Sequence, residues 1–249
     1  MDISVKQQEQ QVDITFFVPC LNEEKNVENT LQVILSAVAE ARVTYEILVV
    51  DDCSEDGTVG VVEAFHRAHP ELPVVLVTSE HNLGLGHNYA RGARMAHGRH
   101  YMLVNGDNVE RLEVITALLA KLGQADIIIP YFGRLDNRPL IRRIISRMFT
   151  MLVNFLSGNR IGYYNGAVVH LRENVVRWHP GTRGFAYEAE LITRLLAQGA
   201  THVQVEVPSE ERQHGVSKAF RLRNFVSVAG SLARIAARRL RRAVSCGVR

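Results

Sequence analysis

The stretch EILVVDDCSEDGT, residues 46–58, contains the pattern from which we infer the fold of this chain. Its first five residues, Glu46–Val50, are mostly apolar and rich in β-branched side chains, and turn-forming residues follow at once. A short apolar run ended by a turn is typical of a buried strand. Apolar residues at helical spacing then follow over Thr58–His69. The stretch therefore predicts a strand, an acidic turn at Asp51 and Asp52, and a helix.

The same alternation extends to both sides of this stretch. Six further apolar runs predict strands: Ile14–Val18, Val74–Val77, Tyr101–Val104, Ile127–Ile129, Ala167–Leu171 and Val203–Val207. Helical spacing recurs over Asn26–Ala41 and Val109–Leu122. Alternating strands and helices predict an α/β fold with a mainly parallel sheet. Ligands of such sheets bind at the carboxyl ends of the strands, and here the segments 19–24, 51–58 and 105–108 all place carboxylates there.

The composition of the 249 residues is that of a soluble globular protein. Hydrophobic residues make up 47% and charged residues 22%, which excludes a disordered or collagen-like chain. Three cysteines are too few for a disulfide framework or a zinc site. Residues 1–12 are polar, so we expect a flexible N-terminus without a signal peptide. No run of 18 apolar residues predicts a transmembrane helix, and we expect a cytoplasmic protein.

The net charge of +3 averages two different parts of the chain. Residues 212–249 contain nine Arg, one Lys and no acid, which is +10, whereas residues 1–211 carry −7. A basic tail suggests an anionic partner, and arginines among the apolar residues of 220–244 suit an amphipathic helix on anionic lipid. A helix packed on the domain with a solvated basic face explains the pattern equally well. Without an aromatic stacking platform, we expect no nucleic-acid partner.

Four motifs together resemble one known family. They are FFVPCLNEEKNV at 16–27, EILVVDDCSEDGT at 46–58, HNLGLGHNYARG at 81–92 and YMLVNGDN at 101–108. In this order and spacing they resemble the family 2 glycosyltransferases, and among these the polyprenyl-phosphate sugar synthases. The resemblance covers residues 13–218 and implies a GT-A fold, a Rossmann-like sheet with helices on both faces. It also implies a nucleotide-binding half up to about residue 130 and an acceptor half after it, followed by a basic amphipathic helix over 219–249.

The resemblance implies that a sugar moves from a nucleoside diphosphate sugar to an acceptor, with inversion and with Mg²⁺ or Mn²⁺ as cofactor. The implied acceptor is a polyprenyl phosphate, at which the protein would lie peripherally on the cytoplasmic face of an anionic membrane. Two alternatives stay open. One is a transferase acting on a non-lipid glycan or a protein, and the other is an inactive homologue that only binds nucleotide sugars.

Residues of the nucleotide and metal loops follow from the resemblance position by position. Those expected to bind the nucleotide are Pro19, Leu21, Asn22, Glu23, Val50, Asp52, Asn82, Gly84 and Gly106. The family's Asp-x-Asp metal motif falls on Asn105 and Asp107, so one carboxylate is replaced by an amide. Asn105 still offers a carbonyl oxygen to a hard cation. The alternative is an Asn-Gly turn in which Asp107 caps a helix starting at Val109.

The acceptor half contributes two kinds of candidate residue. An acid is implied near the reaction centre, and Glu190 fits best, with Glu188 second, although helix N-terminal electrostatics also explains both. Glu190 would act as a general base only if the acceptor were a hydroxyl. The loop at 212–218 resembles a phosphate clamp, which implies catalytic roles for Arg212 and Lys218.

Further basic residues are candidates for binding the acceptor or a phosphate: Arg134, Arg138 and Arg142, with Ser217 in the clamp loop. Two of them lie in the segment 138–156, which combines arginines with a strongly apolar remainder. This segment is read either as a core helix with a charged edge or as an amphipathic element at a membrane interface.

Overall fold

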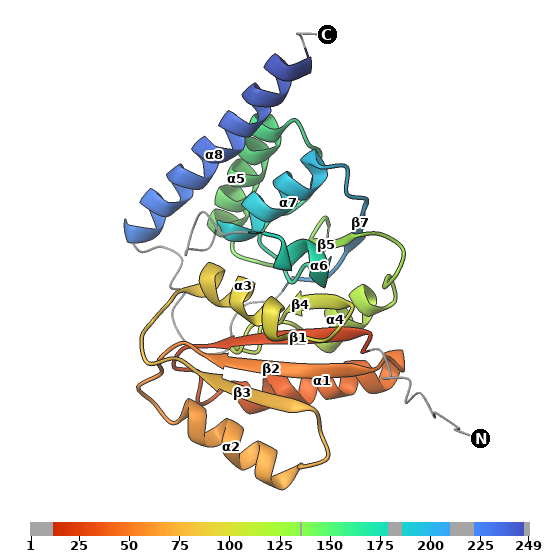
Figure 1. Cartoon of the computed structure of the whole chain (residues 1–249), viewed down its shortest axis with the longest axis vertical. Helices are drawn as coiled ribbons and strands as arrows, with labels where there is room; N and C mark the ends of the chain where they lie inside the picture. The colour runs from red at the N-terminus through yellow and green to blue at the C-terminus, as the bar shows by residue number, and fades with distance from the viewer. Residues whose placement is uncertain (1–11, 135, 179–185, 210–221, 247–249) are drawn as a thin grey trace, which may run out of the picture.

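The computed structural model describes residues 12–134, 136–178, 186–209 and 222–246 (Figure 1). The strands are β1 (Ile14–Cys20), β2 (Tyr45–Asp51), β3 (Val74–Thr78), β4 (His100–Leu103), β5 (Ile127–Tyr131), β6 (Val169–Leu171) and β7 (His202–Glu206). The helices are α1 (Val27–Ala41), α2 (Thr58–Ala68), α3 (Leu85–Met95), α4 (Leu112–Leu119), α5 (Leu140–Ser157), α6 (Arg172–Val176), α7 (Tyr187–Ala197) and α8 (Leu222–Cys246). All seven predicted strands are confirmed.

The strands form one sheet in the order β3-β2-β1-β4-β6-β5-β7. Neighbouring strands are parallel except that β6 runs antiparallel to both β4 and β5. Because β6 is flanked by β4 and β5 and antiparallel to each, β4 and β5 run in the same direction as β1 and β2. The strands other than β6 therefore all end at one edge of the sheet, here called the carboxyl edge. The predicted mainly parallel sheet is confirmed.

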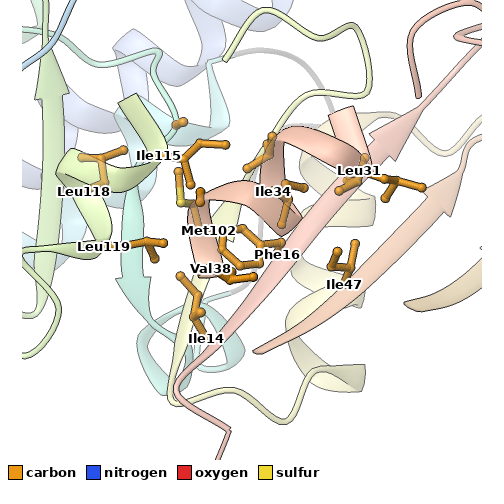
Figure 2. Packing of buried hydrophobic residues seen from close by; sticks show 14 of the residues in the cluster. Ile14, Phe16, Leu31, Ile34, Val38, Ile47, Met102, Ile115, Leu118 and Leu119 are labelled. Atoms are coloured by element: carbon orange, nitrogen blue, oxygen red, sulfur yellow. The ribbon is translucent and has the colours of Figure 1, made fainter. Parts of the chain in front are cut away.

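Adjacent residues of β1 face opposite sides of the sheet, as the period of a strand requires. Phe16 belongs to an apolar cluster with residues of α1, α2 and α4, part of which Figure 2 shows around Leu31, Ile34 and Ile115. Phe17 belongs to a second cluster with residues of α3, α5, α6, α7 and α8. Each face of the sheet is thus covered by its own set of helices, which confirms the α/β fold predicted from the alternation.

Helix α3 was not expected, because its sequence HNLGLGHNYARG suggests a loop. Its glycines are instead required by close packing on the sheet. A Cβ on Gly92 would lie 2.8 Å from the Phe17 ring and would overlap the Tyr101 hydroxyl. Tyr89, on the same helix, packs edge-on against Phe17 at 5.6 Å between ring centroids. Helix α6 was likewise not predicted, since its five residues are too few to show a period.

Helix α8 packs against α5 and α7 in the half of the molecule remote from β3 (Figure 1). Its Ile235 and Ser231 are buried, and Ile235 joins the second apolar cluster. Helix α8 is therefore packed on the domain, as one of the two alternatives for the basic tail predicts. Its exposed side still presents arginines. The expected domain boundary near residue 218 falls outside the described residues. In the described part of the chain, no helix is both long and apolar enough to cross a bilayer.

Candidate nucleotide-sugar site

The loops that follow β1 and β2 are joined by reciprocal hydrogen bonds at the carboxyl edge. Asn22 adopts a left-handed backbone with φ of 57°. Its N–H donates to Ser54 Oγ at 2.9 Å, and its Oδ1 accepts from the Glu55 N–H at 2.8 Å. The Glu23 N–H donates to Thr58 Oγ1 at 2.9 Å. Asn22 thereby fixes the shape of the predicted nucleotide loop, a contribution in addition to any contact with a ligand.

Asp52 holds the loop that precedes α3. Its two carboxylate oxygens accept from the N–H groups of Leu83 at 2.7 Å and Gly84 at 3.0 Å. The Asp52 side chain is buried, and Gly84 takes a φ of 85° that favours glycine. The expected contact between Asp52 and a base therefore has to coexist with this role. Asn82, next to the bonded pair, is exposed and available at the same edge.

The loop after β4 is closed by Glu110, a residue that the sequence analysis did not single out. Glu110 accepts from the Asn105 backbone N–H at 3.0 Å and from Asn105 Nδ2 at 2.8 Å. The Thr30 hydroxyl of α1 donates to the backbone carbonyl oxygen of Asn105 at 3.4 Å. Helix α4 begins only at Leu112, so the alternative in which Asp107 caps a helix starting at Val109 is wrong. The sequence feature that could have indicated this contact is an acid three residues after Asp107.

Carboxylates converge on the end of β1. Burial, followed by the negative charges of Asp51, Glu23 and Asp107, raises the pKa of the Cys20 thiol well above its ordinary value. Burial and the charge of Asp107 also raise the pKa of Glu110 to about 7. Both shifts reflect burial first and neighbouring negative charge second. Asn105, Asp107 and Glu110 offer only oxygen donors, the type that Mg²⁺ and Mn²⁺ prefer, so the residues present fit a divalent cation.

The remaining residues of the predicted nucleotide set surround this point. Gly106 is required because a Cβ there would lie 2.7 Å from Cys20 Sγ and 3.0 Å from the Pro19 carbonyl oxygen. Pro19 and Leu21 are half-buried beside it. Val50 is only 1% exposed and belongs to the second apolar cluster, so its side chain packs in the core and does not line an open surface.

The two candidate acids of α7 are both committed to partners. Glu188 Oε1 lies 2.6 Å from His170 Nε2 of β6, and both side chains are buried. Glu190 Oε2 accepts from Arg234 Nε of α8 at 3.0 Å. Tyr187, at the start of α7, stacks on Tyr89 of α3 at 4.9 Å. Helix α7 is therefore tied to β6, α3 and α8 together.

The predicted basic residues are distributed differently from one another. Arg138 is held by Asp136 through two bonds of 2.9 Å and lies over the Phe132 ring at 4.3 Å. Arg134 is exposed after β5, and Arg142 is half-buried in the first turn of α5. The clamp residues Arg212, Ser217 and Lys218 lie outside the described residues.

The sheet, with the carboxylates of the β1, β2 and β4 loops gathered at one edge, has the GT-A fold, which solved structures share. The model of glycosyl transferase family 2 matches residues 15–184, and the chain belongs to that family. Both results confirm the resemblance inferred from the four motifs.

Two curated relatives are similar over most of this chain. A dolichyl-phosphate β-glucosyltransferase of Trichomonas vaginalis is 24% identical over 245 residues, covering 91% of this chain and 71% of the relative. An undecaprenyl-phosphate 4-deoxy-4-formamido-L-arabinose transferase of Shewanella sediminis is 25% identical over 207 residues, covering 82% of this chain. This chain spans 61% of that second protein.

Two solved structures share the fold. A mannosyltransferase from Pyrobaculum calidifontis, solved with GDP-mannose and Mn²⁺, superposes with a TM-score of 0.66 at 19% identity, covering 91% of this chain and 64% of that chain. Glucosyl-3-phosphoglycerate synthase from Mycobacterium tuberculosis, solved with UDP, gives a TM-score of 0.67 at 17% identity, covering 90% and 80%.

Proposed function

We propose that this glycosyltransferase moves a sugar from a nucleoside diphosphate sugar to a polyprenyl phosphate at an anionic membrane surface, and that it binds there peripherally. The names of the two curated relatives, which act on dolichyl and undecaprenyl phosphates, favour this acceptor class. The observation that carries the proposal is an apolar helix face that the fold leaves open to solvent.

Helix α5 presents this face, here called the α5 apolar face. Its eight large side chains are 42% to 75% exposed: Leu140, Ile141, Ile144, Ile145, Met148, Met151, Leu152 and Phe155. They recur at helical spacing, so they line one side of the helix, while Thr150 and Val153 are buried on the other side. A contiguous exposed apolar patch marks an interaction site for a protein or a membrane.

The charges beside the α5 apolar face favour lipid. Neither α5 nor α8 contains an Asp or a Glu, and the α8 side chains of Arg239 and Arg241 are exposed. Arg239 donates to the Phe155 carbonyl, which places the basic helix directly beside the apolar one (Figure 1). Each arginine near an anionic bilayer contributes about 1 kcal/mol, and apolar side chains add to this by entering the acyl boundary.

A phosphate acceptor also suits the carboxylates of α7. An acceptor phosphate oxygen is already an anionic nucleophile; it would attack the anomeric carbon while the bond to the diphosphate breaks. A hydroxyl acceptor would need a general base. The Glu190 side chain is buried, and its Oε2 atom already accepts a hydrogen bond from Arg234 Nε at 3.0 Å. With a phosphate acceptor, no such proton transfer is required.

Negative charge develops on the leaving diphosphate, and its stabilisation is the main electrostatic demand of the reaction. In our proposal Asp107 and the side-chain Oδ1 atom of Asn105 hold Mg²⁺ or Mn²⁺, which would supply positive charge to the diphosphate when bound. Gly84 and Asn82 border the nucleotide, with Asp52 fixing their loop. Arg134 and Arg142 lie after β5, which ends at the carboxyl edge, and we assign them to the acceptor phosphate.

The deciding experiment supplies radiolabelled UDP- and GDP-sugars to the protein, with and without Mn²⁺, and offers undecaprenyl or dolichyl phosphate in vesicles or soluble glycan acceptors. Transfer restricted to the lipid phosphates is the expected result. Equal transfer to soluble hydroxyl acceptors would overturn the acceptor, and donor binding without transfer or hydrolysis would favour an inactive homologue.

Membrane binding is tested separately by co-sedimentation with vesicles of phosphatidylglycerol and phosphatidylcholine. The double variant Ile141→Glu/Phe155→Glu should bind at least tenfold more weakly, because two exposed apolar contacts are replaced by charges that the anionic surface repels. Val75→Glu is the matched control, since Val75 is 50% exposed on strand β3, which carries none of the α5 apolar face. Equal loss in both proteins would refute the α5 apolar face as the membrane contact.

A further inference from the structure

The metal loop after β4 has one carboxylate fewer than the motif it resembles, because Asn105 stands where an acid is expected. A nearby acid nevertheless occupies the loop. Both oxygens of Glu110 contact Asn105, one at the backbone N–H and one at Nδ2. Glu110 therefore places a second acid beside the amide that stands in the motif.

The contact also determines which way the Asn105 amide faces. Both Glu110 oxygens accept hydrogen bonds from Asn105, so the amide turns its Nδ2 toward Glu110. The Oδ1 atom is then the end of the amide that remains for another partner. An amide oxygen is a suitable ligand for a hard divalent cation, and Asp107 follows two residues later in the same loop.

We propose that Glu110 is a positioning residue for the metal site, which presents the Asn105 Oδ1 atom to the cation held by Asp107. This inference rests on the metal-dependent transfer proposed above. Outer carboxylates that orient a ligand commonly affect metal affinity by about 10- to 100-fold. The loop thus keeps two acids, with the second one step removed from the metal.

The test measures Mn²⁺ binding directly, by electron paramagnetic resonance of free Mn²⁺ in the presence of UDP or GDP. Glu110→Gln should weaken Mn²⁺ binding at least tenfold, because glutamine has one acceptor oxygen and cannot hold both Asn105 contacts. Placing the acid in the motif itself, as in Asn105→Asp/Glu110→Gln, should bring the affinity back to within about threefold of the parent protein. Glu113→Gln is the control, since Glu113 is exposed at the first turn of α4 and should leave Mn²⁺ binding unchanged.

If the role of Glu110 were purely structural, Glu110→Gln would lower thermal stability, and an acid placed at residue 105 would not restore Mn²⁺ affinity. Unchanged Mn²⁺ affinity in folded Glu110→Gln, or no recovery in the double variant, would overturn the inference. If Glu110→Gln folds poorly, Glu110→Asp keeps the charge with a shorter reach and should give an intermediate loss; parent-like affinity would contradict us. Mn²⁺ binding that depends on Glu110 in a protein without transferase activity would refute the proposed function alone. Sugar transfer by the parent protein without any metal would refute the metal role of this loop and leave the transferase activity in place.

Discussion

Arg234 Nε of helix α8 lies 3.0 Å from Glu190 Oε2 of helix α7, so the basic C-terminal helix contacts the acid predicted near the reaction centre. The Glu190 side chain is 5% exposed and that of Arg234 is 39% exposed. A second arginine, Arg238, donates to the Glu190 carbonyl at 3.4 Å. Helix α8 is therefore packed into the fold through α7 and also carries exposed arginines.

Removing the Arg234 side chain leaves the buried Glu190 carboxylate without its cation. We expect Arg234→Ala to lower the free energy of unfolding by about 2 kcal/mol, since an unsatisfied buried group costs about 1–3 kcal/mol. Chemical denaturation measures the effect. Arg241→Ala, at an exposed position of the same helix, should be nearly neutral. In a Glu190→Gln background the loss should shrink, and an equal loss there would show that Arg234 acts through other contacts.

Glu190→Gln tests whether the reaction needs a base on α7. With a polyprenyl phosphate acceptor we expect kcat to fall less than about tenfold, because a phosphate oxygen does not require a general base. Where a general base is required, it contributes about 10²–10⁴-fold to the rate. Steady-state transfer assays at saturating donor give the value. A loss beyond about 100-fold would establish Glu190 as a catalytic base.

Asp52→Asn replaces one acceptor oxygen with an amide that cannot receive the N–H groups of Leu83 and Gly84 together. The loop before α3 should loosen, and the affinity for a nucleoside diphosphate should fall about tenfold, equal to about 1.4 kcal/mol. Isothermal titration with UDP and GDP measures it. Glu55→Gln serves as control, because Glu55 contributes only its backbone N–H to the neighbouring loop contact. Parent-like affinity in Asp52→Asn would argue against the loop role.

Two glycines give opposite expectations for the same substitution. Gly106→Ala should destabilise the protein by about 1–3 kcal/mol and weaken Mn²⁺ binding, because its methyl group would press on Cys20 and Pro19. Gly60→Ala, in helix α2 with open space around its Cβ, should stabilise by about 0.5–1 kcal/mol. Thermal and denaturant unfolding of both variants test this pair. A neutral Gly106→Ala would contradict the close approach of β1 and the metal loop.

Asp136 makes stability depend on pH at the acid end. Hydrogen bonds from Arg138 and Ser209 lower its pKa from 3.8 to about 2. Between these values the unfolded chain binds more protons than the folded one, so the contribution of Asp136 is complete above about pH 4 and is lost as the pH falls toward 2. The stability difference between the parent protein and Asp136→Asn should shrink over that range in urea unfolding. A difference independent of pH would contradict this assignment.

Local pattern was enough to predict most of the fold. Each strand is a short apolar run, and the helices α1, α2, α4, α5 and α8 follow from apolar residues at helical spacing. Three features escaped this reasoning, one of them the five-residue helix α6, which is too short to show a period. Helix α3 looks like a loop because its glycines serve contacts with β1 and β4, and the antiparallel direction of β6 depends on its partners.

The sequence by itself determined the α/β class, the family resemblance and the acid-rich loops at the strand ends, because periodicity and motif spacing are properties of neighbouring residues. Only the tertiary structure decided what those acids do. Asp52 contacts Leu83, 31 residues away in the sequence, and Glu190 contacts Arg234, 44 residues away. Such pairs exist only once the strands and helices have packed. Even Glu110, close to Asn105 in sequence, acquires its role from burial, which makes a second hydrogen-bonded carboxylate beside the metal loop energetically significant.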